Sequence, residues 1–378
     1  VRKIFFRFSM RTPQVTSSLL EKFLSKPLVS NAQSLPRRTL LVVHPGALGD
    51  VILALPAIRA LRKTLSPDET LCLASFSVGC FLAQAGEVDQ AIPFEGNAGA
   101  IIFNTKEEIP FIGSGWSHSF RWAACWMRDP DGTIAATFSR NGIQEFWIGS
   151  PHESRWTARH QTDRFLEIVQ LQPQGVESAL SLLPLEGEAG RLEIFPQGWD
   201  GKSPLVLCHP GAGSPSKCAQ ASLWGELIHS LEARGVTCMI LQGPADGVAV
   251  AAVLAVLSHP VPIVQEQNLM SLSWIIKTAD LFIGHDSGLT HLAAWVDTPV
   301  IALFGPTDPQ RWAPRRSQVR VLHGHPCRCE SLKERRGCLA RPCLDVPLAR
   351  ILAAAEEILT PTRTLPIHVE GSNSACQT

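Results

Sequence analysis

A short apolar run followed by the tetrapeptide His-Pro-Gly-Ala occurs twice in this chain of 378 residues. Residues 40–43 lead into the first copy, at 44–47, and residues 205–208 lead into the second, at 209–212. Apolar runs that end at Pro and Gly are typical of buried strands followed by a tight loop. A common turn dipeptide can recur by coincidence, but the matching flanks favour two related strand–loop–helix openings. A chain of this length also ordinarily divides into two domains.

The pattern of strands and helices gives the expected domain boundaries. We expect an N-terminal extension over residues 1–38, a Rossmann-like domain over 39–185, a second Rossmann-like domain over 195–360 and a flexible tail over 361–378. The interdomain linker falls in a stretch with Pro and Gly and no firm periodicity. Strands that alternate with helices predict parallel sheets, which bind ligands at the carboxyl ends of their strands. The sequence therefore predicts an α/β fold with two domains that face each other across a cleft.

Composition excludes several classes of protein. Lys and Arg number 34 and balance 34 Asp and Glu, with no long basic run, which argues against a nucleic-acid-binding protein. No apolar run reaches the roughly 18 residues of a membrane-spanning helix. The eleven cysteines are scattered and no secretory signal is recognisable, which favours reduced thiols in a cytosol. We expect a cytoplasmic protein, with at most peripheral contact at the cytoplasmic face of the inner membrane.

The segment 281–294, LFIGHDSGLTHLAA, carries the strongest indication of a ligand. Its apolar start predicts a buried strand, and a helical pattern resumes from Leu289. Asp286, Ser287 and Gly288 therefore lie where a strand ends and a helix begins. Free backbone N–H groups and the positive end of the helix dipole attract an anion at such a position. A carboxylate beside these donors favours a ligand that carries both hydroxyls and phosphate.

The loop after the first strand reads HPGALGDV. Gly46 and Gly49 allow the backbone to approach a ligand closely. Asp50 stands near the start of the following helix, where an acid often does no more than stabilise the first turn. The loop lacks the three glycines of the dinucleotide fingerprint, so we do not expect a nicotinamide cofactor.

The loop after the second apolar run reads HPGAGSPSK. Gly211, Gly213 and Ser214 form a small-residue turn, and Lys217 is able to place a point charge on a phosphate. A solvated surface lysine is the alternative for this loop taken alone. The missing Gly-Lys-Ser/Thr ending argues against hydrolysis of a nucleoside triphosphate with magnesium.

Taken together, the motifs GALGDVILALPAIRALR, HPGAGSPSK, GHDSGLTHLAA and VIALFGPTD resemble those of the bacterial lipopolysaccharide heptosyltransferases and their relatives in glycosyltransferase family nine. The resemblance runs from about Leu40 to Leu359. It implies a two-domain glycosyltransferase-B fold and an inverting, metal-independent transfer that needs no cofactor. It also implies an ADP-heptose or similar nucleotide-sugar donor. Two positions depart from the family's pattern: His44 stands where Arg is frequent, and Cys218 with Ala219 replaces a basic-aromatic pair.

The resemblance also assigns roles to residues of this sequence. Asp50 matches the proposed base that takes a proton from the acceptor hydroxyl, and Lys217 matches a residue at the donor diphosphate. Other positions match backbone groups that bind the phosphates and side chains that contact the sugar or its phosphates. One further position aligns loosely with an acidic residue that contacts the ribose. The predicted donor-binding residues are Ser214, Lys217, Asp246, Asp286, Ser287, Gly288, Leu289 and His291.

Three functions remain open at the level of the sequence. The first is an enzyme that transfers a sugar from an ADP-sugar to a lipopolysaccharide-core or other lipid-linked saccharide. The second is a non-catalytic protein on the same fold that binds a nucleotide sugar or a partner. The third is an epimerase on a related fold, which would release free sugar products without an acceptor. The segment 281–294 also has a purely structural interpretation. In it, His291 is a buried histidine inside a helix and Asp286 is the N-cap of that helix.

Four of the cysteines form a group near the C-terminus. Cys327, Cys329, Cys338 and Cys343 lie in an Arg-rich loop and are a candidate tetrahedral zinc site, although Cys-x-Cys is not a usual spacing for structural zinc. The alternative is a reduced, partly buried loop. The arginines around them either face the ligand, meet an anionic lipid surface or are simply solvated.

Overall fold

The computed structural model describes residues 38–95, 97–103, 120–152, 159–171, 199, 201–266, 268–327, 329, 331–338 and 340–360. The expected N-terminal extension, apart from residue 38, lies outside the described residues. The predicted linker and the C-terminal tail lie outside them as well, and so does the predicted boundary between the two domains.

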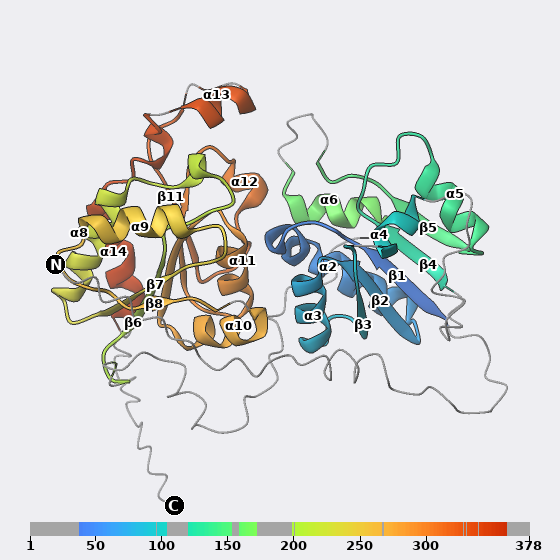
Figure 1. The fold of residues 1–378 in the computed structure, drawn as a ribbon, viewed down its shortest axis with the longest axis horizontal. Helices are drawn as coiled ribbons and strands as arrows, with labels where there is room; N and C mark the ends of the chain where they lie inside the picture. Colours follow the sequence, from blue (N-terminus) through green and yellow to red (C-terminus); the bar gives the residue numbers. More distant parts are fainter. Residues whose placement is uncertain are drawn as a thin grey trace, which may run out of the picture. The chain divides into compact units, whose positions relative to one another are not determined.

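The first half of the described chain forms a five-stranded sheet in the order β3-β2-β1-β4-β5, with every pair of neighbours parallel (Figure 1). Its strands are β1 (Thr39–Val43), β2 (Glu69–Ala74), β3 (Gln90–Pro93), β4 (Phe120–Cys125) and β5 (Glu145–Ile148). Its helices are α2 (Leu48–Leu65), α3 (Phe76–Gln84), α4 (Asn97–Ile102), α5 (Thr133–Arg140) and α6 (Gln161–Ile168).

The second half forms a six-stranded parallel sheet in the order β11-β10-β9-β6-β7-β8. Its strands are β6 (Leu205–His209), β7 (Thr237–Leu241), β8 (Ile263–Val264), β9 (Leu281–His285), β10 (Val300–Phe304) and β11 (Val319–His323). Its helices are η2 (Pro215–Lys217), α8 (Ala221–Glu232), α9 (Gly247–Val256), α10 (Leu269–Thr278), α11 (Gly288–Trp295), α12 (Pro309–Trp312), α13 (Leu332–Gly337), η3 (Pro342–Leu344) and α14 (Leu348–Leu359). The prediction of two parallel α/β sheets is confirmed.

The central strands are buried throughout and mostly apolar because both faces of each sheet are covered. Every residue of β1, β6, β9 and β10 is buried. Alternate residues of β9 pack into different core clusters, with Phe282 on one side and Ile283 on the other. Burial on both faces removes the apolar–polar alternation of a half-exposed strand, so each strand appears in the sequence as a short continuous apolar run.

The strand order fixes where a ligand can bind. β1 lies between β2 and β4, and β6 lies between β7 and β9, so the order of the chain reverses at both central strands. Loops diverge at such switch points and leave room for a ligand beyond the carboxyl ends of the strands. The three loops singled out in the sequence follow β1, β6 and β9. Each therefore begins at a switch point.

Among the helices that the structure describes, none combines the length and the apolar composition that a bilayer span requires.

Candidate active site

Asp50 lies in the first turn of α2, directly beyond the end of β1. The turn before it depends on glycine: the N–H of Gly46 donates to Nδ1 of His44 (3.1 Å). A Cβ on Gly46 would lie 2.5 Å from the His44 ring and 3.2 Å from the Cβ of Asp50. Any side chain there would displace one of the two, so the glycine is what allows the loop to hold Asp50 in place.

His44 itself packs into the core beneath this loop. Its ring lies 5.6 Å from that of Trp126 and 5.3 Å from that of Phe165, between centroids. Burial lowers the pKa of His44 to about 3, so the ring is uncharged at neutral pH. His44 therefore acts as a packing residue and not as a cationic substitute for the arginine frequent at this position.

The carboxylate of Asp50 faces charged groups from other elements. Nε2 of His152 lies 3.8 Å from its Oδ1. Burial raises the pKa of Asp50 and the nearby charge of Asp286 raises it further, whereas His152 and Lys217 act to lower it. Asp50 is thus close enough to Lys217 and Asp286 to respond to their charges.

Lys217 and Asp286 form the central ion pair of the site. Lys217 Nζ donates to Oδ2 of Asp286 at 2.6 Å, and the side chain of Asp286 is almost entirely buried. The lysine ends η2, a short turn closed by a hydrogen bond from its N–H to the carbonyl of Ser214 (3.0 Å). The hydroxyl of Ser214 meets that of Ser216 at 2.9 Å. Lys217 is therefore not the solvated surface lysine of the alternative interpretation.

His291 completes this side of the site. Its Nε2 lies 3.9 Å from Oδ1 of Asp286, and its Nδ1 has no hydrogen-bond partner among the described residues. Burial lowers the pKa of His291 to about 4, although the charge of Asp286 opposes that shift. The ring is therefore neutral at physiological pH, and its Nδ1 is a buried nitrogen without a partner among the described residues.

The cap of α11 is Ser287 and not Asp286. Ser287 Oγ accepts from the N–H of Thr290 (3.4 Å), which is N-cap geometry. The interpretation of Asp286 as a helix cap is therefore wrong, because its oxygens face Lys217 and His291 instead. The next two residues, Gly288 and Leu289, have backbone N–H groups without acceptors inside the helix.

Two glycines bring the starts of α2 and α11 together. A Cβ on Gly49 would lie 3.2 Å from the ring of His291 and 3.3 Å from the Cα of Gly288. A Cβ on Gly288 would in turn lie 3.2 Å from the backbone nitrogen of Gly49. The close approach of the two helix starts places Asp50 on one side and the free N–H groups of α11 on the other.

Asp246 lies beneath the second loop. Its Oδ2 accepts from the N–H of Gly243 (2.8 Å) and meets Nε2 of His209 at 2.9 Å, while Nδ1 of His209 lies 3.3 Å from Ser287 Oγ. The hydrogen bond from His209 contributes to a lowered pKa of Asp246 although burial opposes it. Asp246 thus links the second loop to the cap of α11, and a contact with ribose stays a prediction.

Replacing Gly211 with Ala tests this arrangement, because a Cβ there would lie 2.0 Å from Oδ1 of Asp246. We expect Gly211→Ala to lower the free energy of unfolding in urea by roughly 1–3 kcal/mol, as overpacking does. Gly213 is the matched control, since a Cβ on it meets nothing within 4 Å. Gly213→Ala should stay within about 0.5 kcal/mol of the parent. Equal effects of the two substitutions would contradict the packing described.

The sequence analysis missed His285, the last residue of β9. Its Nε2 accepts from the N–H of Ala219 (2.9 Å), which leaves Nδ1–H to donate to the carbonyl of Gly211 (3.3 Å). Burial lowers its pKa to about 3, which agrees with a neutral ring fixed in one tautomer. Its position at the end of a predicted strand, directly before Asp-Ser-Gly, could have marked it as a residue of the site.

Contacts between the two halves of the sequence were missed as well. Nε2 of His160 lies 2.8 Å from the carbonyl oxygen of Ala313. The guanidinium of Arg315 forms a bidentate ion pair with the carboxylate of Asp163, at 2.7 and 2.8 Å. The stretch that supplies His160 contains no motif that we interpreted.

Two of the other arginines noted in the sequence also have protein partners. Arg316 pairs with Asp297, and Nη1 of Arg341 donates to the carbonyl of Cys218 (2.9 Å). Two of the arginines expected to face a ligand, a lipid surface or solvent are therefore held by the protein itself.

Residues 150–340, about half of the chain, match the family described as glycosyltransferase family 9 (heptosyltransferase). The chain is 29% identical to lipopolysaccharide heptosyltransferase 3 of Escherichia coli over 203 residues, which cover 51% of this chain and 59% of that relative. It is 22% identical to lipopolysaccharide heptosyltransferase 2 of E. coli K12 over 314 residues, which cover 75% of this chain and 87% of that protein. The match to the first relative thus spans less than two thirds of its length.

A solved structure shares the fold. The structure of the E. coli ADP-heptose LPS heptosyltransferase II superimposes with a TM-score of 0.67 at 19% identity, and the match covers 85% of this chain and 98% of that one. This agrees with the two parallel sheets. The chain belongs to glycosyltransferase family 9, the heptosyltransferase family.

Proposed function

We propose that this protein is an inverting, metal-independent glycosyltransferase. It moves a heptose, or a similar sugar, from an ADP-sugar to a lipopolysaccharide-core or other lipid-linked saccharide. The observation that carries the proposal is the meeting of one carboxylate, Asp50, with a lysine and a helix N-terminus at the switch points of two parallel sheets. Transfer of an activated sugar needs a base on one side and positive charge on the other.

The donor side supplies the positive charge. Lys217 and the backbone N–H groups at the start of α11 are groups that bind phosphate oxygens. A diphosphate leaving group develops negative charge as its bond to the sugar breaks, and donors fixed beforehand stabilise that charge without reorganising. Asp286 holds Lys217 in place, and we assign the neutral ring of His291 beside it to a contact with the sugar or its phosphates.

Asp50 supplies the base. In the proposed step the acceptor hydroxyl oxygen forms a bond to the anomeric carbon while Asp50 takes the hydroxyl proton. The bond from the anomeric carbon to the phosphate oxygen breaks, and the electron pair leaves with ADP. Attack on one face and departure from the other inverts the configuration at that carbon.

The acids of the donor side support a step without a divalent cation. Asp286 is engaged by Lys217, and Asp246 by His209 and the N–H of Gly243. Neither acid pairs with the other to offer the oxygen-rich cage that magnesium prefers. Lys217 and the helix N-terminus already provide the charge that a metal would bring.

The identity of donor and acceptor rests on relatives. The relatives are lipopolysaccharide heptosyltransferases, and one solved structure is that of an ADP-heptose LPS heptosyltransferase. We extend these to this chain as the class of donor and acceptor, and we place the reaction at the cytoplasmic face of the inner membrane, where a lipid-linked acceptor would be met.

Thermal stabilisation by nucleotide sugars tests the donor, and release of ADP tests the reaction. We expect ADP-heptose to raise the melting temperature, because a ligand that binds only the folded state stabilises it. UDP-glucose and GDP-mannose serve as controls and should have little effect. ADP release should require a saccharide acceptor. Release of a free sugar without an acceptor would favour an epimerase or hydrolase, and stabilisation by none of the sugars would overturn the proposal.

A further inference from the structure

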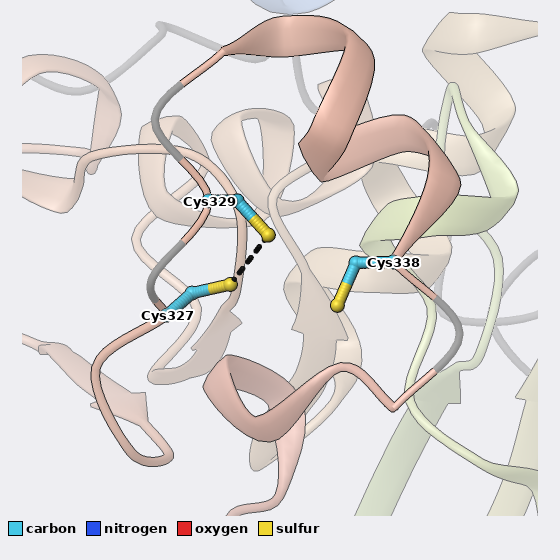
Figure 2. A group of neighbouring side chains, drawn as sticks. All are labelled: Cys327, Cys329 and Cys338. Atoms are coloured by element: carbon cyan, nitrogen blue, oxygen red, sulfur yellow. Dashed lines mark hydrogen bonds between the residues drawn. The ribbon is translucent and has the colours of Figure 1, made fainter.

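Three cysteine thiols converge in the loop that follows β11 (Figure 2). Sγ of Cys327 lies 3.0 Å from Sγ of Cys329, and the sulfurs of Cys327, Cys329 and Cys338 all lie within 4.8 Å of one another. Cys329 and Cys338 are separated in sequence by the short helix α13, yet their sulfurs are neighbours in space. The three side chains are half-buried.

A fourth thiol approaches the same group. Cys343 lies in η3 and is buried. Its thiol is near enough to Cys327 and Cys338 to interact with them electrostatically, although it is not one of the three sulfurs that lie within 4.8 Å of one another. The structure therefore brings three of the four predicted cysteines together and places the fourth beside them, on the other arm of the loop.

The base of this loop is closed by its backbone. The N–H of Gly324 donates to the carbonyl of Cys343, and that of His325 donates to the carbonyl of Pro342, both at 2.9 Å. A Cβ on Gly324 would lie 2.4 Å from the carbonyl oxygen of Pro342, so the two arms are in direct contact. The cysteines lie just beyond this closure.

Beyond its base, the described part of the loop is only partly buried or exposed. Among the described residues from 324 to 342, none is fully buried. A segment of this length without buried apolar side chains needs some other attachment to hold one conformation, and small proteins use disulfides or metal ions for that purpose.

The thiols are unbridged, and their separations suit a shared metal ion. A disulfide joins two sulfurs at about 2.05 Å, which is much shorter than any separation in this group. Four sulfurs placed about 2.3 Å from one zinc ion in a tetrahedron are about 3.8 Å from one another. The separations of 3.0 Å to 4.8 Å bracket that value.

We propose that Cys327, Cys329, Cys338 and Cys343 bind one tetrahedral zinc ion, which holds the loop of residues 324–345 in its folded conformation. Four thiolates without an open position are typical of a structural zinc ion and not of a catalytic one. The ion would join the two arms of the loop, whose described residues beyond the base are not fully buried. The Cys-x-Cys spacing is accommodated because the two side chains already converge.

The loop also contacts the turn that carries Lys217. α13 packs against η2, and Nη1 of Arg341 donates to the carbonyl of Cys218, the residue after Lys217. A loop fixed by zinc would therefore support the conformation of the Lys217 turn. This consequence rests on the proposed function, whereas zinc binding itself does not.

The test is elemental analysis of the purified full-length chain, prepared under reducing conditions. We expect about one zinc per chain, as for a closed four-cysteine site. Cys338→Ser and Cys343→Ser should each reduce the zinc content strongly. Cys80→Ser is the matched control, because Cys80 is another half-buried free cysteine but lies in α3, and it should leave the zinc content unchanged.

A second measurement does not depend on variants that fold. A mercurial added to the parent protein should release zinc to a chelating dye as the thiols react, and Co²⁺ loaded in its place should give the absorption of a tetrahedral thiolate complex. Iron found in place of zinc, with the same dependence on the four cysteines, would overturn the choice of metal. A folded protein that retains no metal after exposure to Zn²⁺ would overturn the site. An increase in the KM for donor in Cys338→Ser would support the link to Lys217, and an unchanged KM would overturn that link alone.

Discussion

Asp50→Asn is expected to lower the kcat of sugar transfer by roughly 10²–10⁴-fold, the usual contribution of a general base. The amide has nearly the same shape as the carboxylate but cannot take the acceptor proton. The Kd for the donor should change little, because the proposed diphosphate contacts come from Lys217 and the start of α11 and not from Asp50. Binding and transfer should therefore separate in this one variant.

The measurement is ADP release under saturating donor and acceptor, alongside donor binding by calorimetry. Glu226→Gln is the control: it removes the same charge from an exposed position on α8. It should leave both quantities unchanged. Undiminished transfer by Asp50→Asn would contradict its assignment as the base. A parent protein that binds donor but never releases ADP would favour the non-catalytic alternative.

The pH profile gives the same residue a second readout. Burial and the charge of Asp286 raise the pKa of Asp50, so its carboxylate takes up a proton at a higher pH than an ordinary aspartate does. A base must be deprotonated to act, and kcat/KM should therefore fall as the pH falls through this raised pKa. Above this pKa, Asp50 is already deprotonated, and its titration should no longer change kcat/KM. The acid limb should disappear in the residual activity of Asp50→Asn, and an unchanged limb would assign it to another group.

Lys217→Met is expected to lower kcat by roughly 10²–10³-fold, the cost of removing one fixed donor from a developing anion. It should also lower the free energy of unfolding, because it leaves the buried carboxylate of Asp286 without its cation. Adding Asp286→Asn should then restore stability but not transfer. That divergence distinguishes a charge needed for chemistry from an ion pair needed only for folding.

The comparison uses urea unfolding and ADP release for the two single variants and the double variant. Lys277→Met serves as the control, since Lys277 is exposed in the last turn of α10. Transfer that recovers together with stability in the double variant would show that Lys217 has only a structural role. A Lys217→Met protein as stable as its parent would contradict the buried pair.

The fold was predictable because its physics is local. A strand buried on both faces appears as a short apolar run, and a parallel sheet sends its loops to one edge, so the positions of Asp50, Lys217 and Asp286 followed from segments of ten to twenty residues. The strand end followed by a helix start, β9 into α11, was predictable for the same reason.

The remaining parts of the site depend on distant partners. The ion pair of Lys217 and Asp286 joins residues that are 69 positions apart. Asp286 is engaged in this pair, and Ser287 is the N-cap of α11. His160 meets Ala313 across 153 residues. No periodicity or turn signal records such contacts, so neither the cap nor the contact between the halves could be predicted from a single sequence.

The repeated His-Pro-Gly-Ala sequence shows how far two copies of a motif can diverge while their letters stay identical. In the first copy His44 is packed between aromatic rings, and in the second His209 connects an acid to a serine hydroxyl. What the copies share is a backbone path away from a central strand. Aligning one copy with the other would therefore predict the backbone path correctly. It would assign the wrong contacts to the histidine.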